Sequence, residues 1–244
     1  MRELLSPQSE DYLKAIYSLG TDRVNTQALA DRLEVKPGSV TEMLKRLADL
    51  GLVEHKPYYG ARLTPAGTRI ALELIRHHRL LESYLYQALG YALEDVHREA
   101  EKLEHHISEE FEARISELLG HPTHDPHGDP IPTLEGKLPD FATRAIIEVG
   151  ENEEVCLGRV SEKDPDFLRL VVSLGLIPGA RVKVIRVSKA SGTITLEVAG
   201  TVQHTLSLEA ARKLWVENAP PTVGATLDSS LSLTDSTATT EDQP

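Results

Sequence analysis

The chain has 244 residues and a formal net charge of −12, and cysteine occurs once, at Cys156. This length suffices for two or three small domains, and a single cysteine excludes a disulfide framework and a zinc site built from cysteines. With no long apolar run and no signal peptide expected, we predict a cytoplasmic protein without a membrane segment. Residues 66–140 hold seven basic and fifteen acidic residues. Such a charge cluster repels itself unless a cation neutralises it, and a divalent metal would do so.

Residues 1–64 are predicted to form a winged helix-turn-helix domain. Ser6-Pro7 is a helix start, because Ser caps a helix and Pro suits its first position. Two shorter helices are expected over 25–33 and 39–49, joined by the turn that a helix-turn-helix requires. Two short runs, 52–56 and 61–63, are separated by the turn 57–60 and predict a β-hairpin that would serve as the wing.

The exposed side of the third helix carries small hydroxyls near its start and basic residues behind them. Hydroxyls in the major groove can contact base edges, while basic side chains hold phosphates, so this pattern indicates DNA binding. The predicted DNA contacts, including those on the wing, are Lys36, Ser39, Thr41, Glu42, Lys45, Arg46, Lys56 and Arg62. A winged helix used for protein contacts is the alternative.

Residues 65–140 are predicted to be a helical domain that places imidazole and carboxylate groups together. In a connecting helix over 65–90, His78 and Glu82 are four residues apart and share one face. Residues 93–119 contain neither Gly nor Pro, and their apolar spacing predicts one long amphipathic helix. An arc of roughly 100° on that helix, bordering the apolar stripe, carries His97, Glu101, Glu104 and His105. This face is either a solvated acidic surface or part of a metal site, and two such helices favour the metal.

The remaining chain changes character twice. The loop over 121–132 is rich in Pro and Gly, which favours a turn-rich loop over a metal site built from its histidines. Alternating apolar and polar residues then predict a small barrel-like β domain over 141–218, with one helix over 166–174 and a short helix that starts at Ser207. The segment 219–244 is rich in Ser, Thr, Pro and Gly, has no Lys or Arg, and is expected to be a disordered tail.

Several long motifs resemble, in the same order, one family: the metal-dependent repressors of the diphtheria toxin repressor and manganese transport regulator (DtxR/MntR) type. The resemblance covers about residues 6–218. The motifs that carry it are Ser9–Leu13, Arg76–Glu82, Glu94–His105, Gly128–Pro132 and Leu174–Val182. It implies a mainly α fold with a small β part: a winged helix-turn-helix DNA-binding domain, a helical metal-binding and dimerisation domain, and an SH3-like β-barrel domain similar to FeoA.

The resemblance also implies a function. It predicts a homodimeric, metal-dependent regulator that binds double-stranded operator DNA and represses metal-uptake genes, with two metal ions in each subunit and no enzymatic activity. By residue match, the regulatory metal site comprises Asp11, Glu101, Glu104 and His105. The second site comprises His78, Glu82 and His97, to which the third domain adds Glu162.

Departures from the family pattern bear on the metal. Iron-responsive members carry Met and Cys at the positions of Asp11 and Glu101. This chain instead has oxygen ligands at both positions, as manganese-responsive members do. Oxygen and imidazole ligands suit Mn²⁺ better than a thioether and a thiolate, so we expect Mn²⁺, with Fe²⁺ as the alternative. Manganese-responsive members place a carboxylate where this chain has Lys14, and Arg159 stands where iron-type members place one. We therefore do not expect the complete ligand geometry of either group in this chain.

The expected mechanism is a metal that fixes one domain against the other. With Asp11 on one side and the three ligands of the long helix on the other, two recognition helices of a dimer could lie about 34 Å apart, one turn of DNA. Two other classes stay open on the residues alone. Glu and His on facing helices could form a di-iron or hydrolytic enzyme site, although neither a repeated Glu-x-x-His motif nor an activated nucleophile is evident. A metal buffer without DNA affinity is the third class.

Overall fold

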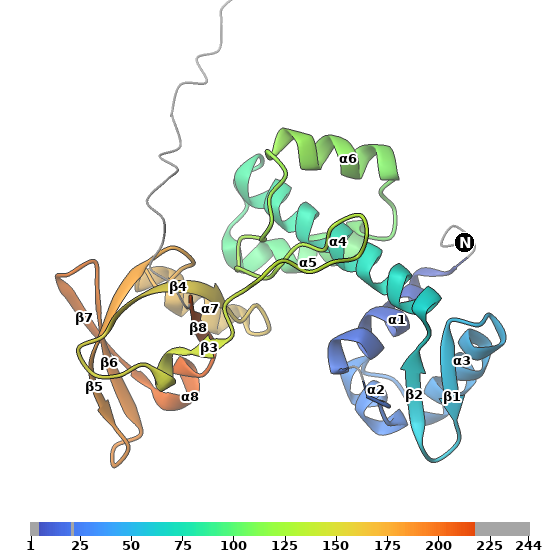
Figure 1. Cartoon of the computed structure of the whole chain (residues 1–244), viewed down its shortest axis with the longest axis horizontal. Helices are drawn as coiled ribbons and strands as arrows, with labels where there is room; N and C mark the ends of the chain where they lie inside the picture. The colour runs from blue at the N-terminus through green and yellow to red at the C-terminus, as the bar shows by residue number, and fades with distance from the viewer. Residues whose placement is uncertain (1–4, 21, 218–244) are drawn as a thin grey trace, which may run out of the picture.

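The computed structural model describes residues 5–20 and 22–217, so the predicted disordered tail lies outside the described residues. Within them, three folded units follow one another along the chain. A helical unit lies between the N-terminal unit and the C-terminal β unit, as Figure 1 shows. The candidate metal ligands gather at the two junctions between these units.

The N-terminal unit is a winged helix-turn-helix, as the sequence predicts. Its elements are α1 (Pro7–Leu19), α2 (Thr26–Arg32), α3 (Pro37–Asp49), β1 (Val53–Lys56) and β2 (Gly60–Leu63). Ser6 caps α1, because its side chain accepts a hydrogen bond from the Ser9 amide. Leu13, Leu29 and Leu44 are fully buried and join the three helices in one core. The antiparallel pair β1 and β2 forms the wing.

One long helix, α4 (Pro65–Gln87), connects the N-terminal unit to the helical unit. It begins directly after β2, where the Thr64 side chain accepts a hydrogen bond from the Gly67 amide. Its first part contributes Ile70 to the core of the N-terminal unit, and its later part contributes Leu80 to the core of the helical unit. The two units are therefore joined by a continuous helix rather than by a loop.

The prediction of a single long helix after α4 is wrong, because the structure has two helices there, α5 (Leu93–Leu103) and α6 (Glu109–Leu118). Ser108 starts the second one, since its side chain accepts a backbone hydrogen bond and three acidic residues follow in the first turn. These start signals outweigh the apolar periodicity. The chain turns after α5, so that α6 folds back against α4, and Glu104 and His105 lie at the C-terminal end of α5.

The C-terminal unit is a six-stranded antiparallel sheet with two short helices. Its elements are β3 (Arg144–Ala145), a 3₁₀ turn (Ile146–Glu148), β4 (Glu154–Val160), α7 (Pro165–Ser173), β5 (Arg181–Ser188), β6 (Thr193–Val198), β7 (Val202–Ser207), α8 (Leu208–Ala211) and β8 (Leu214–Val216). The strand order is β3-β8-β4-β5-β6-β7. The strands predicted from the sequence are present, but the sheet is open, because β3 and β7 lie at its edges. A strand of two residues such as β3 is too short to close the sheet into a barrel.

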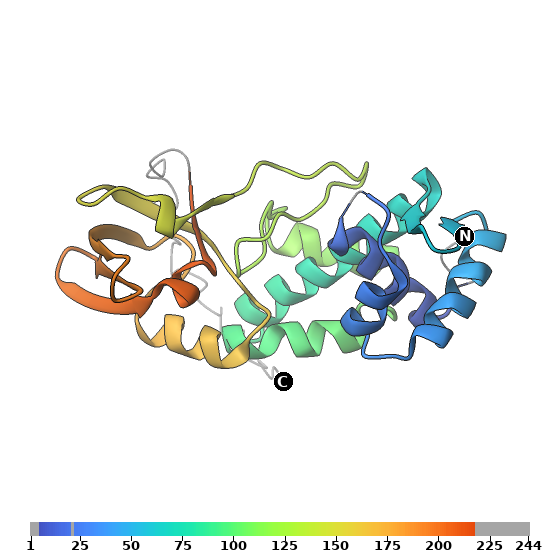
Figure 2. The same cartoon turned by 90° about the horizontal axis from the view of Figure 1, so that it is seen from below.

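The β unit is docked on the helical unit by α7 and by the loop that follows α6. α7 lies beside α5, as Figure 2 shows, and Leu93 at the start of α5 is buried in the core of the β unit. The loop over 121–132 is irregular, as predicted, but much of it is buried between the two units. The backbone amide of Val160 in β4 donates a hydrogen bond to the His127 carbonyl at 2.9 Å.

A glycine, Gly128, allows this loop to lie directly on β4. Gly128 has a φ of +88°, a conformation that glycine adopts readily and other residues rarely do. A Cβ added at Gly128 would lie 1.9 Å from the Gly158 carbonyl oxygen, which is backbone and cannot rotate away. The contact between loop and strand therefore requires glycine at position 128 for conformation and for space.

We predict that Gly128→Ala weakens this docking much more than a matched change elsewhere. Gly120→Ala is the control, because Gly120 has a φ of +71° but nothing lies within 4 Å of an added Cβ. The left-handed backbone should cost each variant roughly 1–2 kcal/mol, and the clash should cost Gly128→Ala about 1–3 kcal/mol more. Chemical denaturation of the metal-free proteins measures the difference. Equal losses of unfolding free energy would show that the loop can move away from β4 without cost.

Candidate metal centres

The first candidate site, which we call the interdomain cluster, consists of Asp11, Glu104 and His105. Asp11 comes from α1 in the N-terminal unit, whereas Glu104 and His105 come from the end of α5. Nε2 of His105 lies 3.0 Å from Oδ1 of Asp11 and 3.6 Å from Oε1 of Glu104. One donor atom from each residue thus lies within 4.8 Å of the others, as a shared cation would require. The structure brings these three predicted ligands together.

A second acidic residue of α1, Glu10, orients the imidazole of this cluster. Nδ1 of His105 donates a hydrogen bond to Oε2 of Glu10 at 2.6 Å, which turns Nε2 toward Asp11. Histidines that bind metals commonly donate their other ring nitrogen to a carboxylate in this way. Burial lowers the pKa of His105, but the hydrogen bonds to Asp11 and Glu10 outweigh it and raise the pKa to about 9. The sequence assigns Glu10 no role, because nothing in it shows that this acidic residue lies on the buried face of α1 opposite His105.

Glu101, the fourth predicted ligand of the regulatory site, points elsewhere. Its side chain is 53% exposed, and Oε1 lies 3.4 Å from Nε2 of His97. The hydrogen bond with His97 lowers the pKa of Glu101 to about 2. Glu101 and Asp11 nevertheless line the same cavity of about 600 Å³. The carboxylate of Glu101 therefore borders the interdomain cluster without contacting its three members in this arrangement.

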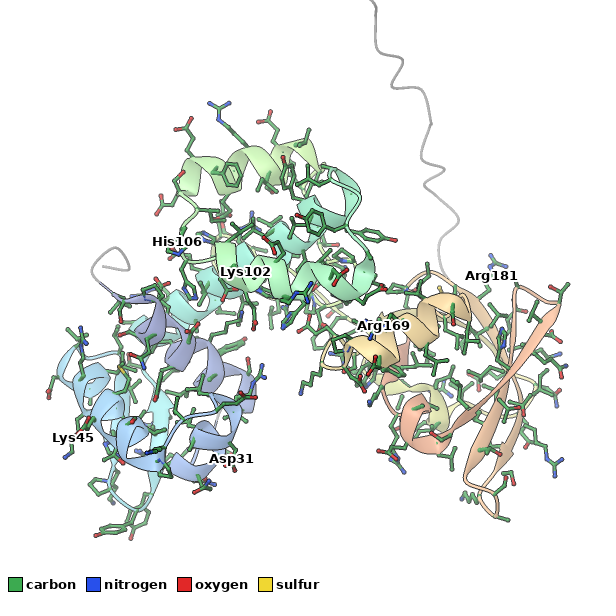
Figure 3. The ribbon with its side chains drawn as sticks, turned by 180° about the vertical axis from the view of Figure 1, so that it is seen from behind. Asp31, Lys45, Lys102, His106, Arg169 and Arg181 are labelled. Carbon is green, nitrogen blue, oxygen red and sulfur yellow. The ribbon has the colours of Figure 1, made fainter. Side chains whose placement is uncertain are left out.

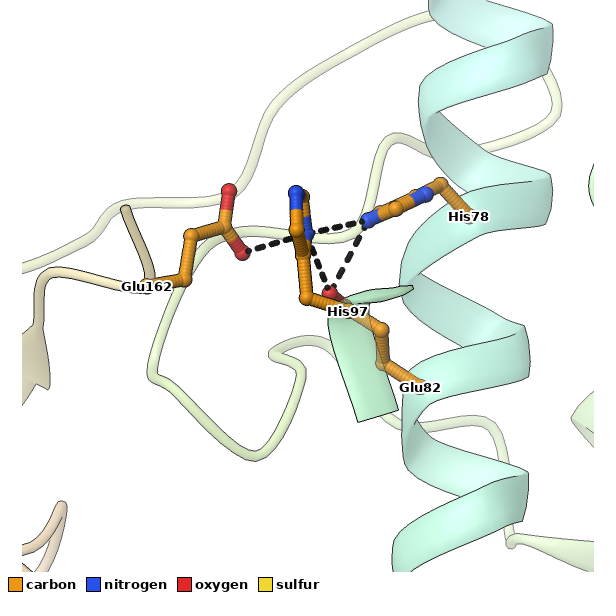
Figure 4. A group of neighbouring side chains, drawn as sticks. All are labelled: His78, Glu82, His97 and Glu162. Atoms are coloured by element: carbon orange, nitrogen blue, oxygen red, sulfur yellow. Dashed lines mark hydrogen bonds and ion pairs between the residues drawn. The ribbon is translucent and has the colours of Figure 1, made fainter. Parts of the chain in front are cut away.

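The second candidate site, which we call the α4 cluster, joins the helical unit to the β unit. Its members are His78, Glu82, His97 and Glu162, and Figure 4 shows them converging. Nε2 of His78 lies 2.9 Å from Oε1 of Glu82 and 3.0 Å from Nδ1 of His97. Oε2 of Glu162, which lies just after β4, is 3.6 Å from Nδ1 of His97. All four predicted ligands of the second site are thus brought together, with Glu162 as the contribution of the β unit.

The loop over 121–132 adds two residues beside this cluster. The sequence pattern favours a turn-rich loop and does not predict that its side chains lie here. Nδ1 of His127 lies 3.6 Å from Oε2 of Glu162 and 3.8 Å from Oε2 of Glu82, and Asp125 has an oxygen in the same group. Asp125 and His127 are two residues apart and lie just before a matched family motif, but no local signal predicts that such a loop is buried. The loop therefore supplies two further oxygen and imidazole donors.

Three donor atoms around this cluster are buried without a hydrogen-bond partner among the described residues. They are Oε2 of Glu82, Oδ2 of Asp125 and Nδ1 of His127. Burial raises the pKa of Glu82, but its histidine neighbours, led by His78, outweigh it and lower the pKa well below its usual value. Buried polar atoms without hydrogen-bond partners are costly, and a cation bound here would give the carboxylate oxygens of Glu82 and Asp125 a closer partner than their ion pairs with His127 and Arg79. The donor set of carboxylate and imidazole groups therefore fits a divalent metal.

Two arginines hold the loop and the β unit around the α4 cluster. Arg159 of β4 donates a hydrogen bond to Oδ1 of Asp129 at 3.1 Å, and its guanidinium lies 3.9 Å above the Trp215 ring. Arg79 of α4 donates a hydrogen bond to the Pro130 carbonyl and forms ion pairs with both aspartates of the loop. Arg159, which departs from the iron-type pattern, therefore holds the loop through Asp129 and stacks on an aromatic ring.

The predicted DNA contacts lie at the start of α3, along α3 and on the two strands of the wing. Figure 3 shows Lys45 on the outer side of this unit, while Lys102 and His106 lie on the helical unit. Of the eight predicted residues, all but the half-buried Thr41 are exposed. Thr41 donates its hydroxyl to the Pro37 carbonyl at 3.1 Å, and Arg62 of the wing is paired with Glu54 at 2.8 Å. These two side chains have partners within the chain that DNA contact would have to replace or share.

Comparison with known proteins identifies the family of the chain. Residues 4–61 match the iron dependent repressor N-terminal DNA binding domain, residues 64–133 match the iron dependent repressor metal binding and dimerisation domain, and residues 146–218 match the FeoA domain. The iron-dependent repressor IdeR of Mycobacterium leprae is 31% identical over 223 residues, which are 86% of this chain and 96% of that protein. The chain belongs to the diphtheria toxin repressor family. It is therefore a metal-dependent transcriptional repressor.

Manganese-dependent members are also similar to this repressor. The HTH-type transcriptional regulator MntR of Geobacillus kaustophilus is 34% identical over 116 residues, which are 47% of this chain and 82% of that protein. A solved manganese-dependent transcriptional repressor in complex with manganese is 36% identical, with a TM-score of 0.80 over 86% of this chain and 99% of that one. ScaR with bound Zn²⁺ is 34% identical, with a TM-score of 0.71 over 86% of this chain and 98% of that one.

Family membership decides between the classes that the residues left open. The N-terminal unit is a DNA-binding domain and the helical unit a dimerisation domain. A winged helix used for protein contacts, a metal enzyme and a metal buffer without DNA affinity are therefore all set aside. The C-terminal β unit is the predicted SH3-like, FeoA-type domain, with an open sheet. No helix among the described residues is long and apolar enough to cross a membrane.

The raised pKa values of two histidines predict how the stability of the metal-free repressor depends on pH. Burial lowers the pKa of His127, but Glu82 and other carboxylates outweigh it and raise the pKa to about 9, as for His105. A histidine whose pKa is higher in the folded state than its unfolded value of about 6.5 stabilises the fold when protonated. That contribution is complete below pH ~6.5 and is lost as the pH rises through the folded pKa values. With a chelator present, the free energy of unfolding should therefore fall between pH ~6.5 and ~9.

Urea unfolding at several pH values across this window measures the effect. His105→Gln should remove its share of the pH dependence, because the amide does not titrate there, whereas His106→Gln, at an exposed histidine outside the cluster, should leave the dependence unchanged. A stability that stays constant or rises across the window would contradict the protonated arrangement.

Proposed function

We propose that this protein is a Mn²⁺-responsive homodimeric repressor of metal-uptake genes, with two metal ions in each subunit. The observation that carries the proposal is the interdomain cluster, where Asp11 of the DNA-binding domain meets Glu104 and His105 of the dimerisation domain. An Fe²⁺-responsive repressor of iron-uptake genes is the alternative. Because the target of a repressor is chromosomal DNA, the cytoplasm is its proposed place of action.

The chemistry of the donors supports Mn²⁺. The clusters offer carboxylate oxygens and imidazole nitrogens, and these ligands suit Mn²⁺ without favouring a softer metal. Cys156, the one thiol of the chain, is buried in β4 and belongs to neither cluster. One solved structure that this chain resembles is a manganese-dependent transcriptional repressor in complex with manganese, which agrees with this preference.

The position of Asp11 supports a coupling between metal and DNA. Asp11 projects from α1, whose buried residues Leu13 and Ile16 belong to the same core as α3, the recognition helix. A cation bound to Asp11, Glu104 and His105 would connect the two domains through these three ligands. A modest preference for the DNA-competent arrangement then shifts the population of that arrangement strongly, and operator and metal strengthen each other's binding reciprocally.

Proposed ligands of the α4 cluster would link the β unit to the same response. Glu162 follows β4, and the loop residues Asp125 and His127 pack against that strand. We add Asp125 and His127 to the proposed ligands of this site, beside His78, Glu82, His97 and Glu162. The second ion per subunit would therefore hold three segments of the chain together.

Exposed apolar side chains on the helical unit suit its dimerisation role. They are Tyr86, Leu89, Tyr91, Leu103, Phe111 and Leu118, which lie on or beside α4, α5 and α6. A second copy of the chain that covered such side chains would remove them from water. Two copies of α3 could then contact successive turns of the major groove, about 34 Å apart.

The first test is operator binding titrated with Mn²⁺. Asp11→Ala removes the ligand that spans the domains, so half-saturation should need at least ~10-fold more Mn²⁺, about 1.4 kcal/mol. Glu101→Ala tests the proposed ligand at the edge of the cluster and should also weaken the response. Glu99→Ala, on the same helix but paired with Lys102, is the control and should match the wild type. Unchanged Mn²⁺ dependence in both Asp11→Ala and Glu101→Ala would overturn the coupling.

The second test concerns the recognition helix. Lys45→Ala and Arg46→Ala should each weaken operator binding at all sequences, because these exposed side chains are proposed to hold phosphates. For each phosphate that a variant no longer neutralises, the slope of log affinity against log salt should fall in magnitude by ~0.9. Lys102→Ala, on the dimerisation domain, controls for the removal of one positive charge. If the slope is the same in all three variants, neither Lys45 nor Arg46 touches phosphate.

A further inference from the structure

Lys14 of α1 occupies the space between the two candidate metal clusters. Its Nζ donates hydrogen bonds to both carboxylate oxygens of Glu104, at 2.9 Å and 2.8 Å, and lies 3.2 Å from Nδ1 of His78. Asp11 is three residues earlier on the same helix, so both side chains point to the same side of α1. The Lys14 side chain is 18% exposed, which leaves it little freedom to turn away into water. An ammonium group thus contacts one member of each cluster.

Glu104 is the residue for which Lys14 and a metal would compete. The Glu104 side chain is 2% exposed, and Oε2 is also only 2.5 Å from Nδ1 of His78. Each oxygen of this carboxylate therefore already has a cationic or hydrogen-bonding neighbour. A divalent cation that shared Glu104 with Asp11 and His105 would stand close to the fixed positive charge of Lys14. Like charges at such distances repel strongly where burial reduces screening.

The lysine also makes the same interdomain connection that the cluster makes. Lys14 belongs to α1 of the DNA-binding domain, and Glu104 caps α5 of the dimerisation domain. Its bonds to Glu104 therefore link the two domains without any metal. A buried carboxylate needs cationic or hydrogen-bonding partners, and in the metal-free protein Lys14 is one of the partners of Glu104, beside His78.

We propose that Lys14 is a built-in counter-cation that competes with the divalent metal for Glu104 and so sets the metal concentration at which the interdomain cluster fills. The inference rests on the proposed function in one respect, that this cluster takes a divalent cation. It goes beyond that function, because it assigns the affinity of the site to a residue that is not a ligand. Lys14 keeps the site empty at low metal concentration and holds the domains together while it is empty.

The test is Mn²⁺ binding by the full chain, followed through the electron paramagnetic resonance signal of free Mn²⁺ at constant ionic strength. Lys14→Met keeps the length of the side chain and removes its charge, so Mn²⁺ should bind the interdomain cluster at least ~10-fold more tightly, about 1.4 kcal/mol. Lys14→Arg keeps the charge and should stay within about threefold of the wild type. Lys102→Met removes a positive charge from an exposed ion pair on α5 and should bind like the wild type.

A double variant assigns the change to the correct cluster. If Lys14 acts at the interdomain cluster, the gain from Lys14→Met disappears when Asp11→Ala is added, whereas the gain persists if it arises at the α4 cluster. Lys14→Gln replaces Lys14→Met if the apolar side chain prevents folding. Unchanged or weaker Mn²⁺ binding in the uncharged variants overturns the proposal, since a lysine that merely positions Glu104 would give that result. A gain that survives in the Asp11→Ala background overturns it as well.

The same measurements separate this inference from the proposed function. If Lys14→Met tightens Mn²⁺ binding but operator binding ignores Mn²⁺, the competition stands and the Mn²⁺-responsive repressor fails. If operator binding depends on Mn²⁺ through Asp11 but the charge at position 14 has no effect on Mn²⁺ affinity, the repressor stands and the competition fails.

Discussion

The structure depends on pairs of buried charges across the junction between the DNA-binding and dimerisation domains. Glu10 and Glu104 are nearly inaccessible to solvent, and each finds its cationic partner on the opposite domain. A buried carboxylate without such a partner would cost several kcal/mol. The apolar cores of the two domains are separate and share only α4, so these polar contacts fix how the domains lie against one another beyond that helix. A cation that entered this junction would therefore change the balance of charges that holds the two domains together.

The second junction follows the same rule with different residues. The β unit meets the helical unit through Leu93, and around that apolar contact Glu162, Arg159 and Asp129 add ion pairs across the junction. Three atoms at this junction are buried and lack hydrogen-bond partners among the described residues, whereas the carboxylates at the first junction are paired. Both junctions contain cationic side chains, but the second also has buried polar atoms that could form further bonds.

Local signals explain why much of the fold could be predicted from the sequence. The start of α1 follows from Ser6 and the proline after it, and the strands of the β unit follow from alternation, because these features depend on neighbouring residues alone. The break between α5 and α6 is not predicted because two local signals conflict. Apolar periodicity runs through the segment, whereas Ser108 and the acids after it start a new helix. The absence of Gly and Pro is not enough to keep the helix whole.

The candidate sites were predictable to the extent that their spacing is local. His78 and Glu82 face each other because they are four residues apart on one helix. Asp11 is linked to His105 through family resemblance, since 94 positions separate them and no periodicity connects them. Glu10, Lys14 and His127 receive no binding or positioning role from the sequence, because their importance comes from what the tertiary fold places opposite them. The direction of the Glu101 side chain is likewise a tertiary property.

The break at Ser108 has an electrostatic consequence for the interdomain cluster. Because α5 ends at Leu103, Glu104 and His105 lie beside the last carbonyl groups of a helix rather than in the middle of one. The peptide dipoles of a helix sum to about half a negative charge at its C-terminal end, within one turn of it. The backbone of α5 therefore attracts cations to this position independently of its acidic side chains. A helix that continued to Leu119 would have moved that field some four turns away from Asp11.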